Sequence, residues 1–345
     1  MPAVRAQAAR RARDEAIAPS WSLEELDAPQ PVLPVITGCA RSGTTLLKLT
    51  LDSRSDMAML PGTERDVLLA RRPRRLETDG GLDVDRFVEL LRSGSLWDRW
   101  ELDAEAVRAA LRVERPRTAI QAVRRLGAIY ARRRNKTRWG TQGPEYAPEI
   151  ARIARRLPEA RFVHLIRDGR DVAPALLDVF FATDNVVDAA VQWRRRVRAA
   201  REAGRALGPD RYRELRYEDL VTAPERTLRT LCDFLELDFD QSMLRHHERE
   251  MDTVPTHPQL AHHGRLTLPV TPGLRDWRRD LDPATVALLE LAAGDVLEEL
   301  GYPLAGRAPA TVAAVRARGR IAVATMRDRW QPGRVKRVAR VLRGS

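Results

Sequence analysis

Short apolar segments separated by long helical patterns recur along the chain. One of them, 32–36, is almost continuously apolar, which is typical of a strand buried on both faces of a parallel sheet, and 160–166 is also clearly predicted as a strand. The weaker segments 57–60 and 212–217 are also predicted as strands. Ligands of open α/β sheets sit at the carboxyl ends of the strands, so the residues that follow these segments are the first candidates for a site.

Between the strands, apolar residues recur at spacings of three and four, the period of an amphipathic helix. Strands that alternate with helices in this way predict an α/β domain. The closing helix is predicted to begin at Asp282, followed by proline at the first helical position. Helices are predicted from 44 to about 52, within 83–134, from about 168 to 181, over 186–205, over 224–235 and over 282–300.

The segment 136–144 interrupts the helical pattern, and a helix is expected after it over 146–157. Prolines at positions 19, 29 and 31 separate the N-terminal stretch from the first strand. The predicted organisation is an N-terminal arm over 1–30, an α/β domain over 31–303 with a helical insertion over 84–134, and a C-terminal tail over 304–345 that is helical in pattern.

The net charge of +12 is concentrated at the C-terminus. After Pro303 the chain carries eleven basic residues and one acid, Asp328, so the body is close to neutral and nucleic-acid binding is not expected. Val312, Val315, Ile321, Val323 and Met326 are predicted to form the apolar face of a basic helix. Contact with an anionic membrane, contact with a partner, and a solvated tail all remain open.

The remaining composition indicates a protein of the reducing cytoplasm, either free or peripheral to a membrane. There is no apolar run of membrane-spanning length and no secretory signal at the N-terminus. Cys39 and Cys232 are too few for a disulfide framework and are expected to be buried free thiols. Adjacent histidines at 246–247 and 262–263 point apart in regular structure, so no metal site is predicted.

The segment 32–36 leads into a loop with two glycines and then into a predicted helix. Glycines let the backbone curl so that successive N–H groups point inward as an anion site, and the helix N-terminus adds partial positive charge. The sequence therefore predicts a phosphate-binding loop. Its candidate binding residues are Gly38, Arg41, Ser42, Gly43, Thr44 and Thr45.

The loop departs from that of nucleoside triphosphatases, which have Lys directly after the second glycine. Here Thr44 follows Gly43 and the cation, Arg41, precedes it. A second strand–turn–helix unit places Arg167 where the strand 160–166 ends, with Arg170 three residues further on.

Three blocks resemble the sulfotransferase family that uses 3′-phosphoadenosine 5′-phosphosulfate (PAPS), in the branch of the bacterial and Golgi-type enzymes that includes tyrosylprotein and heparan sulfotransferases. They are Gly38-Cys39-Ala40-Arg41-Ser42-Gly43-Thr44-Thr45, Arg167-Asp168-Gly169-Arg170-Asp171-Val172 and Arg216-Tyr217-Glu218-Asp219-Leu220, and Arg275-Asp276-Trp277 is similar to a late basic segment of the family. The resemblance covers about residues 32–303 and implies a P-loop-like three-layer α/β/α fold with a central, mainly parallel sheet, here with the helical insertion and the basic tail.

The resemblance also implies roles for single residues. Residues 41–45 would hold the 5′-phosphosulfate, with Arg41 stabilising charge on the bridging oxygen as 3′,5′-ADP leaves. Arg167 would meet the 3′-phosphate, and Tyr217 would lie near the nucleotide. Glu64, which follows the Pro61-Gly62 turn, would be the general base that takes the proton of an acceptor hydroxyl, and no metal is needed.

Two departures from the family pattern bear on activity. Ala175 stands where the family has a Ser that bonds the 3′-phosphate, so Arg170 or the basic loop from Arg275 is expected to compensate. Gln142 follows Trp139-Gly140 where the family often has Lys, and it cannot supply that charge. A catalytically impaired nucleotide-binding protein of the same fold and a P-loop kinase are therefore the alternatives. The acceptor is left open among carbohydrates, lipids, peptides and secondary metabolites.

Overall fold

The computed structural model describes residues 30–61, 76–94, 97–178, 185–248, 275–306 and 308–329, with the side chains of the last range described as far as Val323. Within them a five-stranded parallel sheet has the order β2-β5-β1-β6-β7. Its strands are β1 (Leu33–Gly38), β2 (Met57–Met59), β5 (Arg138–Gln142), β6 (Ala160–Ile166) and β7 (Tyr212–Arg216).

The central strand β1 is buried along its whole length. Consecutive side chains point to opposite faces of a sheet, so Val35 packs into the apolar cluster on one face and Ile36 into the cluster on the other. The pairing Ile36↔Gln142 on one side and Gly38↔Leu165 on the other brings the carboxyl ends of β5, β1 and β6 to one edge. The loop that follows β1 therefore lies among residues from both neighbouring strands.

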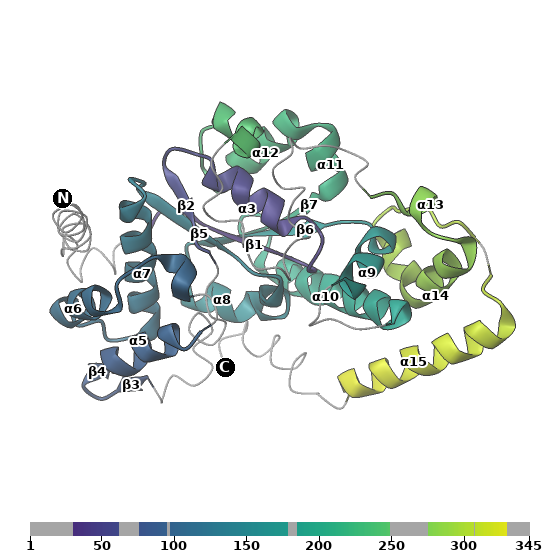
Figure 1. The fold of residues 1–345 in the computed structure, drawn as a ribbon, viewed down its shortest axis with the longest axis horizontal. Helices are drawn as coiled ribbons and strands as arrows, with labels where there is room; N and C mark the ends of the chain where they lie inside the picture. Colours follow the sequence, from purple (N-terminus) through teal and green to yellow (C-terminus); the bar gives the residue numbers. More distant parts are fainter. Residues whose placement is uncertain are drawn as a thin grey trace, which may run out of the picture.

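Helices cover both faces of the sheet (Figure 1). One layer contains α3 (Thr44–Asp52), α11 (Tyr217–Thr222), α12 (Pro224–Leu235) and the 3₁₀ helix η4 (Gln241–Glu248). The other contains α8 (Ile150–Arg156), α9 (Gly169–Leu177), α10 (Val186–Leu207) and α14 (Pro283–Glu299). The predicted three-layer α/β/α fold with a parallel central sheet is confirmed.

The segment 84–134 forms a helical unit beside β2 and β5, at one end of the molecule in Figure 1. Each α-helix in it begins at a side-chain cap: Asp83, Asp103 and Thr118 accept hydrogen bonds from backbone N–H groups of the first turn. The elements are α5 (Val84–Arg92), η2 (Trp97–Trp100), α6 (Ala104–Glu114) and α7 (Ala119–Arg133), preceded by the hairpin β3 (Glu77–Thr78) and β4 (Gly81–Leu82).

Two segments differ from the sequence prediction. The segment 136–144, expected to interrupt the pattern, contains β5. At the centre of this strand is Gly140, where a Cβ would lie 2.6 Å from the Met59 sulfur and 3.0 Å from a backbone oxygen. The neighbouring strands leave no room for a side chain there, so the sequence lacks the apolar alternation of a typical strand. The helix expected over 146–157 is divided: a 3₁₀ helix, η3 (Pro144–Glu149), contains Pro148, and α8 begins only after it.

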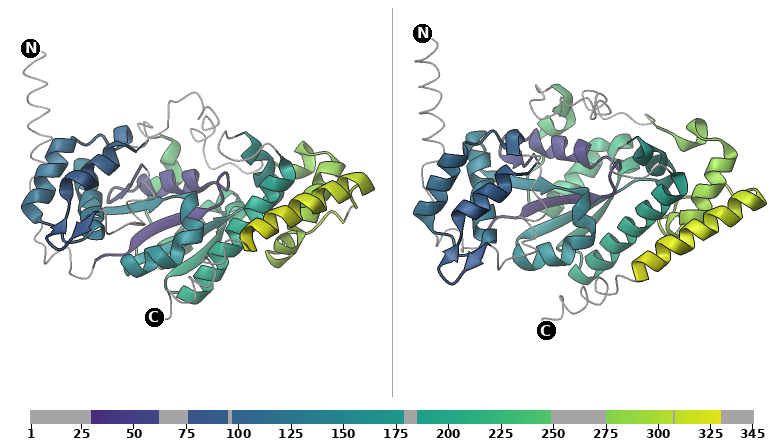
Figure 2. Two further views of the ribbon diagram at one scale, coloured as in Figure 1. Left: turned by 90° about the horizontal axis from the view of Figure 1, so that it is seen from below. Right: turned by 60° about the horizontal axis from the view of Figure 1, so that its bottom comes forward.

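The C-terminal elements pack beside α9 and α10 (Figure 2). A short helix, α13 (Trp277–Asp280), precedes α14, and α14 begins as predicted with Asp282 as its cap and Pro283 in its first turn. The last helix is α15 (Thr311–Arg329). It buries Ala314 and Ala317, and Ile321 packs against the core. Ile321 therefore does not share a face with the exposed Val312 and Val315, and the prediction that placed them together is wrong for Ile321. Among the described residues, no helix is long and apolar enough to cross a membrane.

Candidate functional site

The loop between β1 and α3 closes tightly against the neighbouring strand. A Cβ on Gly38 would lie 2.5 Å from the backbone oxygen of Leu165, so only glycine permits this approach. The Ser42 N–H donates to the Cys39 carbonyl at 3.1 Å, which closes the turn. Arg41 and Gly43 both have left-handed backbones, with φ of 72° and 94°. This alternation of backbone conformation is the kind that forms an anion-binding concavity.

The N-terminus of α3 faces this concavity. Its N-cap is Gly43, and no side chain of the described residues makes a capping hydrogen bond there. The first N–H groups of a helix have no partner within the helix, so those of α3 remain available to an anion. Ser42 and Thr44 are buried, and Arg41 and Thr45 are half-buried. The structure thus brings the predicted loop residues together around one helix N-terminus.

Gln142 reaches this loop from the carboxyl end of β5. Its Nε2 donates to Oγ1 of Thr44 at 3.0 Å. Gln142 pairs with Ile36 near the end of β1, so it lies beside Thr44, the first residue of α3. This is the position at which the family often carries Lys. In this chain the contact is a neutral hydrogen bond and supplies no positive charge.

Tyr217 links the loop to Arg167. A Cβ on Gly43 would lie 2.6 Å from Cδ2 of Tyr217, so the ring lies directly against the loop backbone. The Arg167 guanidinium carbon lies 4.4 Å from the centre of the same ring, a cation–π geometry. Three residues from the three sequence blocks therefore form one stack at the carboxyl edge of the sheet.

The Arg167 side chain is 10% exposed, and one of its nitrogens faces Asp171, with Nη2 3.6 Å from Oδ2. Its Nε is buried without a hydrogen-bond partner among the described residues. Burial raises the pKa of Asp171 to about 6, against the opposing charge of Arg167. A guanidinium with a buried donor still unpaired is suited to an anion such as phosphate.

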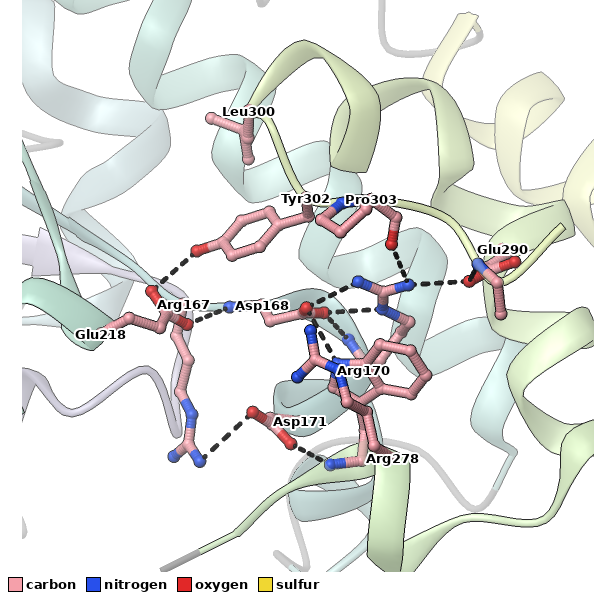
Figure 3. A network of polar contacts seen from close by, with 12 residues as sticks. Arg167, Asp168, Arg170, Asp171, Glu218, Arg278, Glu290, Leu300, Tyr302 and Pro303 are labelled. Atoms are coloured by element: carbon pink, nitrogen blue, oxygen red, sulfur yellow. Dashed lines mark hydrogen bonds and ion pairs between the residues drawn. The ribbon is translucent and has the colours of Figure 1, made fainter. Parts of the chain in front are cut away.

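Arg170 lies elsewhere (Figure 3). It is fully buried, its guanidinium stacks 3.8 Å over the Trp277 ring, and its Nη2 is 2.8 Å from Oδ2 of Asp168. Nη1 donates to Glu290 at 2.7 Å and to the Pro303 carbonyl at 2.8 Å. The donors of Arg170 thus join α9 to the C-terminal elements. The predicted contact of Arg170 with the nucleotide does not fit this position, and we leave it out of the site.

Figure 3 also shows that the residues next to Arg167 make hydrogen bonds to α11 and to the C-terminal elements. Glu218 accepts from the Asp168 N–H at 3.0 Å and from the Tyr302 hydroxyl at 2.9 Å. The Trp277 N–H donates to Asp171 at 2.8 Å, and its indole Nε1 donates to Asp168 at 3.1 Å. The motif around Arg167 is thereby fixed by contacts with α11, α13 and the residues after α14. The sequence showed Glu218 and Trp277 within recognisable blocks but gave no signal for Tyr302.

The structure places two of the other residues singled out in the sequence, Arg275 and Ala175, on or beside α9. Arg275 pairs with Asp178 at 2.7 Å. Asp178 follows the last residue of α9, nine residues after Gly169 and so about 13 Å along the helix. Ala175 is buried on α9. Glu64 lies outside the described residues, which end at Pro61, just beyond β2.

Neither cysteine is poised to act as a nucleophile. Both are buried free thiols, as predicted. Burial raises the pKa of Cys39 in the loop to about 12 and that of Cys232 to about 11. Because the thiolate is the reactive form, these groups are inert at neutral pH.

A parallel α/β sheet whose central strand leads through a glycine-containing loop into a helix N-terminus is the architecture of the phosphate-loop class of proteins. Residues 34–241 match the Sulfotransferase family, which is more than half of the chain. The chain belongs to the sulfotransferase family. The predicted resemblance is confirmed.

Curated relatives agree with this assignment. The protein-tyrosine sulfotransferase of Drosophila melanogaster is 25% identical over 218 residues, which are 62% of this chain and 40% of that protein. The omega-hydroxy-beta-dihydromenaquinone-9 sulfotransferase of Mycobacterium tuberculosis is 31% identical over 128 residues, 32% of each. The matches therefore span less than half the length of either relative.

Solved structures show the same fold. The sulfotransferase domain from the Synechococcus PCC 7002 olefin synthase superposes with a TM-score of 0.57 at 25% identity, covering 83% of this chain and 98% of that domain. The sulfotransferase domain from the curacin biosynthetic pathway gives the same TM-score at 20% identity and covers 80% of this chain and all of that domain.

Proposed function

We propose that the protein transfers a sulfuryl group from PAPS to an acceptor hydroxyl and releases 3′,5′-ADP. One observation carries the proposal: Gly43, Tyr217 and Arg167 stack at one edge of the sheet. A helix N-terminus and an arginine whose buried Nε has no partner among the described residues therefore lie at the same edge. Two separate anion sites joined by an aromatic ring suit a nucleotide with phosphates at both its 5′ and 3′ positions.

In this proposal the loop binds the 5′-phosphosulfate. The N–H groups at the start of α3, the Arg41 guanidinium and the hydroxyls of Ser42, Thr44 and Thr45 surround it. Sulfuryl transfer spreads charge over the oxygens of an in-line transition state, as phosphoryl transfer does, so fixed donors stabilise it directly. Arg41 would stabilise the charge that develops on the bridging oxygen.

Arg167 would hold the 3′-phosphate. Its Nε is buried and has no hydrogen-bond partner in the part of the chain that the structure describes, and its contact with Asp171 is long, at 3.6 Å. Binding a phosphate at this edge of the guanidinium satisfies that donor. The Tyr217 ring, already in contact with Arg167 and Gly43, would lie beside the nucleotide and fix the spacing between the two anion sites.

Glu64 would be the general base. It follows β2, whose carboxyl end lies at the same edge of the parallel sheet as the loop. A carboxylate within hydrogen-bond reach of an acceptor hydroxyl can take its proton as the O–S bond forms. The proposed catalytic residues are thus Glu64 and Arg41, and the mechanism requires no metal.

One observation supports a second candidate, a nucleotide-binding protein with weakened catalysis. Gln142 makes a neutral contact with Thr44 at the position where the family often has Lys. A missing charge beside the transferring group would lower the rate of transfer more than the affinity for the nucleotide. The two candidates are separated by measuring binding and transfer in the same preparation.

Binding is tested by calorimetric titration of 3′,5′-ADP, with 5′-AMP and ATP–magnesium as comparison ligands. We expect 3′,5′-ADP to bind the tightest, and Arg167→Met to weaken it at least tenfold while leaving 5′-AMP unchanged. Arg112→Met is the matched control, because Arg112 is an exposed ion-pair partner of Asp85. Equal affinity of wild type for 3′,5′-ADP and 5′-AMP, or a preference for ATP–magnesium, would contradict the proposal.

Transfer is tested with radiolabelled PAPS and acceptors of several classes. The relatives are named for protein tyrosine and for a hydroxylated menaquinone, so tyrosine peptides and hydroxylated quinones come first, followed by carbohydrates. Glu64→Gln should bind 3′,5′-ADP as wild type does and lose transfer. Binding without transfer to any acceptor would favour the impaired candidate, and restoration of transfer by Gln142→Lys would establish it.

A further inference from the structure

The outer face of α15 exposes a stripe of valines. Val312, Val315 and Val323 are 67%, 63% and 52% exposed. At about 100° per residue, these three positions fall within an arc of roughly 80° on one side of the helix. Single exposed apolar residues are ordinary, but a row of them along one helix face marks a contact surface.

The opposite face of α15 packs against the domain, which orients the valine stripe toward the exterior. Ala314 and Ala317 are buried, and Ile321 packs with the apolar cluster that includes residues of α10 and α14. Arg320 adds an ion pair to Asp188 of α10 at 2.8 Å. In Figure 2 the helix lies along the outside of the molecule in both views. The valines are therefore held toward the exterior by the fold itself.

Basic side chains flank the stripe. Arg316 and Arg318 are exposed, and Arg320 is exposed apart from its ion pair. The sequence after Pro303 has eleven basic residues and a single acid. If a second copy of this face docked here, its arginines would lie against these arginines. The chain's own C-terminal residues are also basic, so docking them here would likewise bring positive charges together. The charge favours an anionic occupant that also accepts apolar side chains.

We propose that the outer face of α15 docks on an anionic lipid bilayer. The valines enter the boundary between headgroups and acyl chains, and Arg316 and Arg318 contact lipid phosphates on either side. Gly319 lies in the stripe, and no atom of the described residues outside the helix's own backbone would lie within 4 Å of a Cβ there, so this part of the face is open. This inference does not depend on the proposed sulfuryl transfer.

The test is flotation of the full-length protein with vesicles of phosphatidylcholine alone or of phosphatidylcholine with phosphatidylglycerol. Wild type should float with the anionic vesicles and remain behind with the neutral ones. Replacing Val312, Val315 and Val323 together by Ser should weaken binding at least tenfold. Val113→Ser is the matched control, because Val113 is 65% exposed on α6, in the helical unit.

A second pair of variants tests the charge. Each arginine near an anionic surface strengthens binding about fivefold, so Arg316→Gln with Arg318→Gln should weaken it about twenty-five-fold. All five side chains are exposed, so unchanged melting temperatures are expected. Failure of wild type to bind anionic vesicles would overturn the proposal, as would full binding by the triple Ser variant. A dimer in size-exclusion chromatography that the triple variant abolishes would assign the face to a second copy instead.

Discussion

Replacing Gly43 with Ala tests the central contact of the site. The backbone there has φ of 94°, and the new Cβ would lie 2.6 and 2.8 Å from two carbons of the Tyr217 ring. The left-handed conformation costs a non-glycine residue about 1–2 kcal/mol. Displacing the ring also disturbs its contact with Arg167, which is worth about 0.5–2 kcal/mol. Together we expect a loss of about 1.5–4 kcal/mol in the free energy of unfolding.

The assay combines urea unfolding with titration of 3′,5′-ADP. The affinity for 3′,5′-ADP should fall at least tenfold, because the Tyr217 ring lies between the loop and Arg167. Displacing the ring should also shift the loop backbone and the N–H groups at the start of α3. Gly319→Ala is the matched control: Gly319 is helical, and its Cβ would meet nothing within 4 Å. That substitution should stabilise the protein by up to about 1 kcal/mol and leave nucleotide affinity unchanged.

A double-mutant cycle separates the two causes. In a Tyr217→Ala background the Gly43→Ala substitution meets no ring, so it should cost only the backbone term of about 1–2 kcal/mol. The reasoning is refuted if Gly43→Ala costs as much without the ring as with it. It is also refuted if Gly43→Ala behaves like Gly319→Ala.

Three buried titratable groups give further predictions, each read from unfolding free energies across pH. Burial lowers the pKa of Lys48 from 10.5 to about 8, so Lys48→Met should stabilise the protein at pH 7 by up to about 3 kcal/mol. That gain should shrink as pH rises from 8 to 10.5, and a gain that is constant with pH would contradict it. Burial raises the pKa of Asp171 from 3.8 to about 6, so its contribution to stability is present below pH 3.8 and lost as pH rises through 6. Asp171→Asn should therefore gain stability relative to wild type between pH 4 and 7, by at most about 3 kcal/mol, and equal pH profiles would argue against a buried carboxylate. Burial lowers the pKa of His164 from 6.5 to about 3, so stability present above pH 6.5 should fall as pH drops toward 3. His164→Gln should flatten that decline, and an unchanged acid limb would exclude His164 as its source.

The parts of the site that depend on neighbouring residues in sequence were predictable. The loop from Gly38 to Thr45 follows an apolar strand and opens a helix, and the structure forms it as expected. The predicted strand 160–166 also forms, and His164 within it is buried with its Nδ1 2.6 Å from the Tyr212 hydroxyl. In these cases a local pattern determines the environment, so one sequence suffices.

The parts that depend on packing between distant segments were not predictable. β5 lacks an apolar alternation because Gly140 is selected by its contact with Met59, more than 80 residues earlier. Tyr302 joins the site only through the return of the chain after α14. Neither contact leaves a periodic signal, because the partner residue lies outside any sequence window.

Arg167 and Arg170 show why a charged motif alone does not assign roles. Arg167 is the residue directly after β6, so its side chain remains at the sheet edge, beside Tyr217. Arg170 is in the first turn of α9. Its guanidinium forms an ion pair with the cap residue Asp168 through Nη2 and a second ion pair with Glu290 through Nη1. Because Arg170 neutralises Asp168, that carboxylate does not compete for Arg167. In the proposed function, the buried Arg170 thereby leaves Arg167 available to the 3′-phosphate.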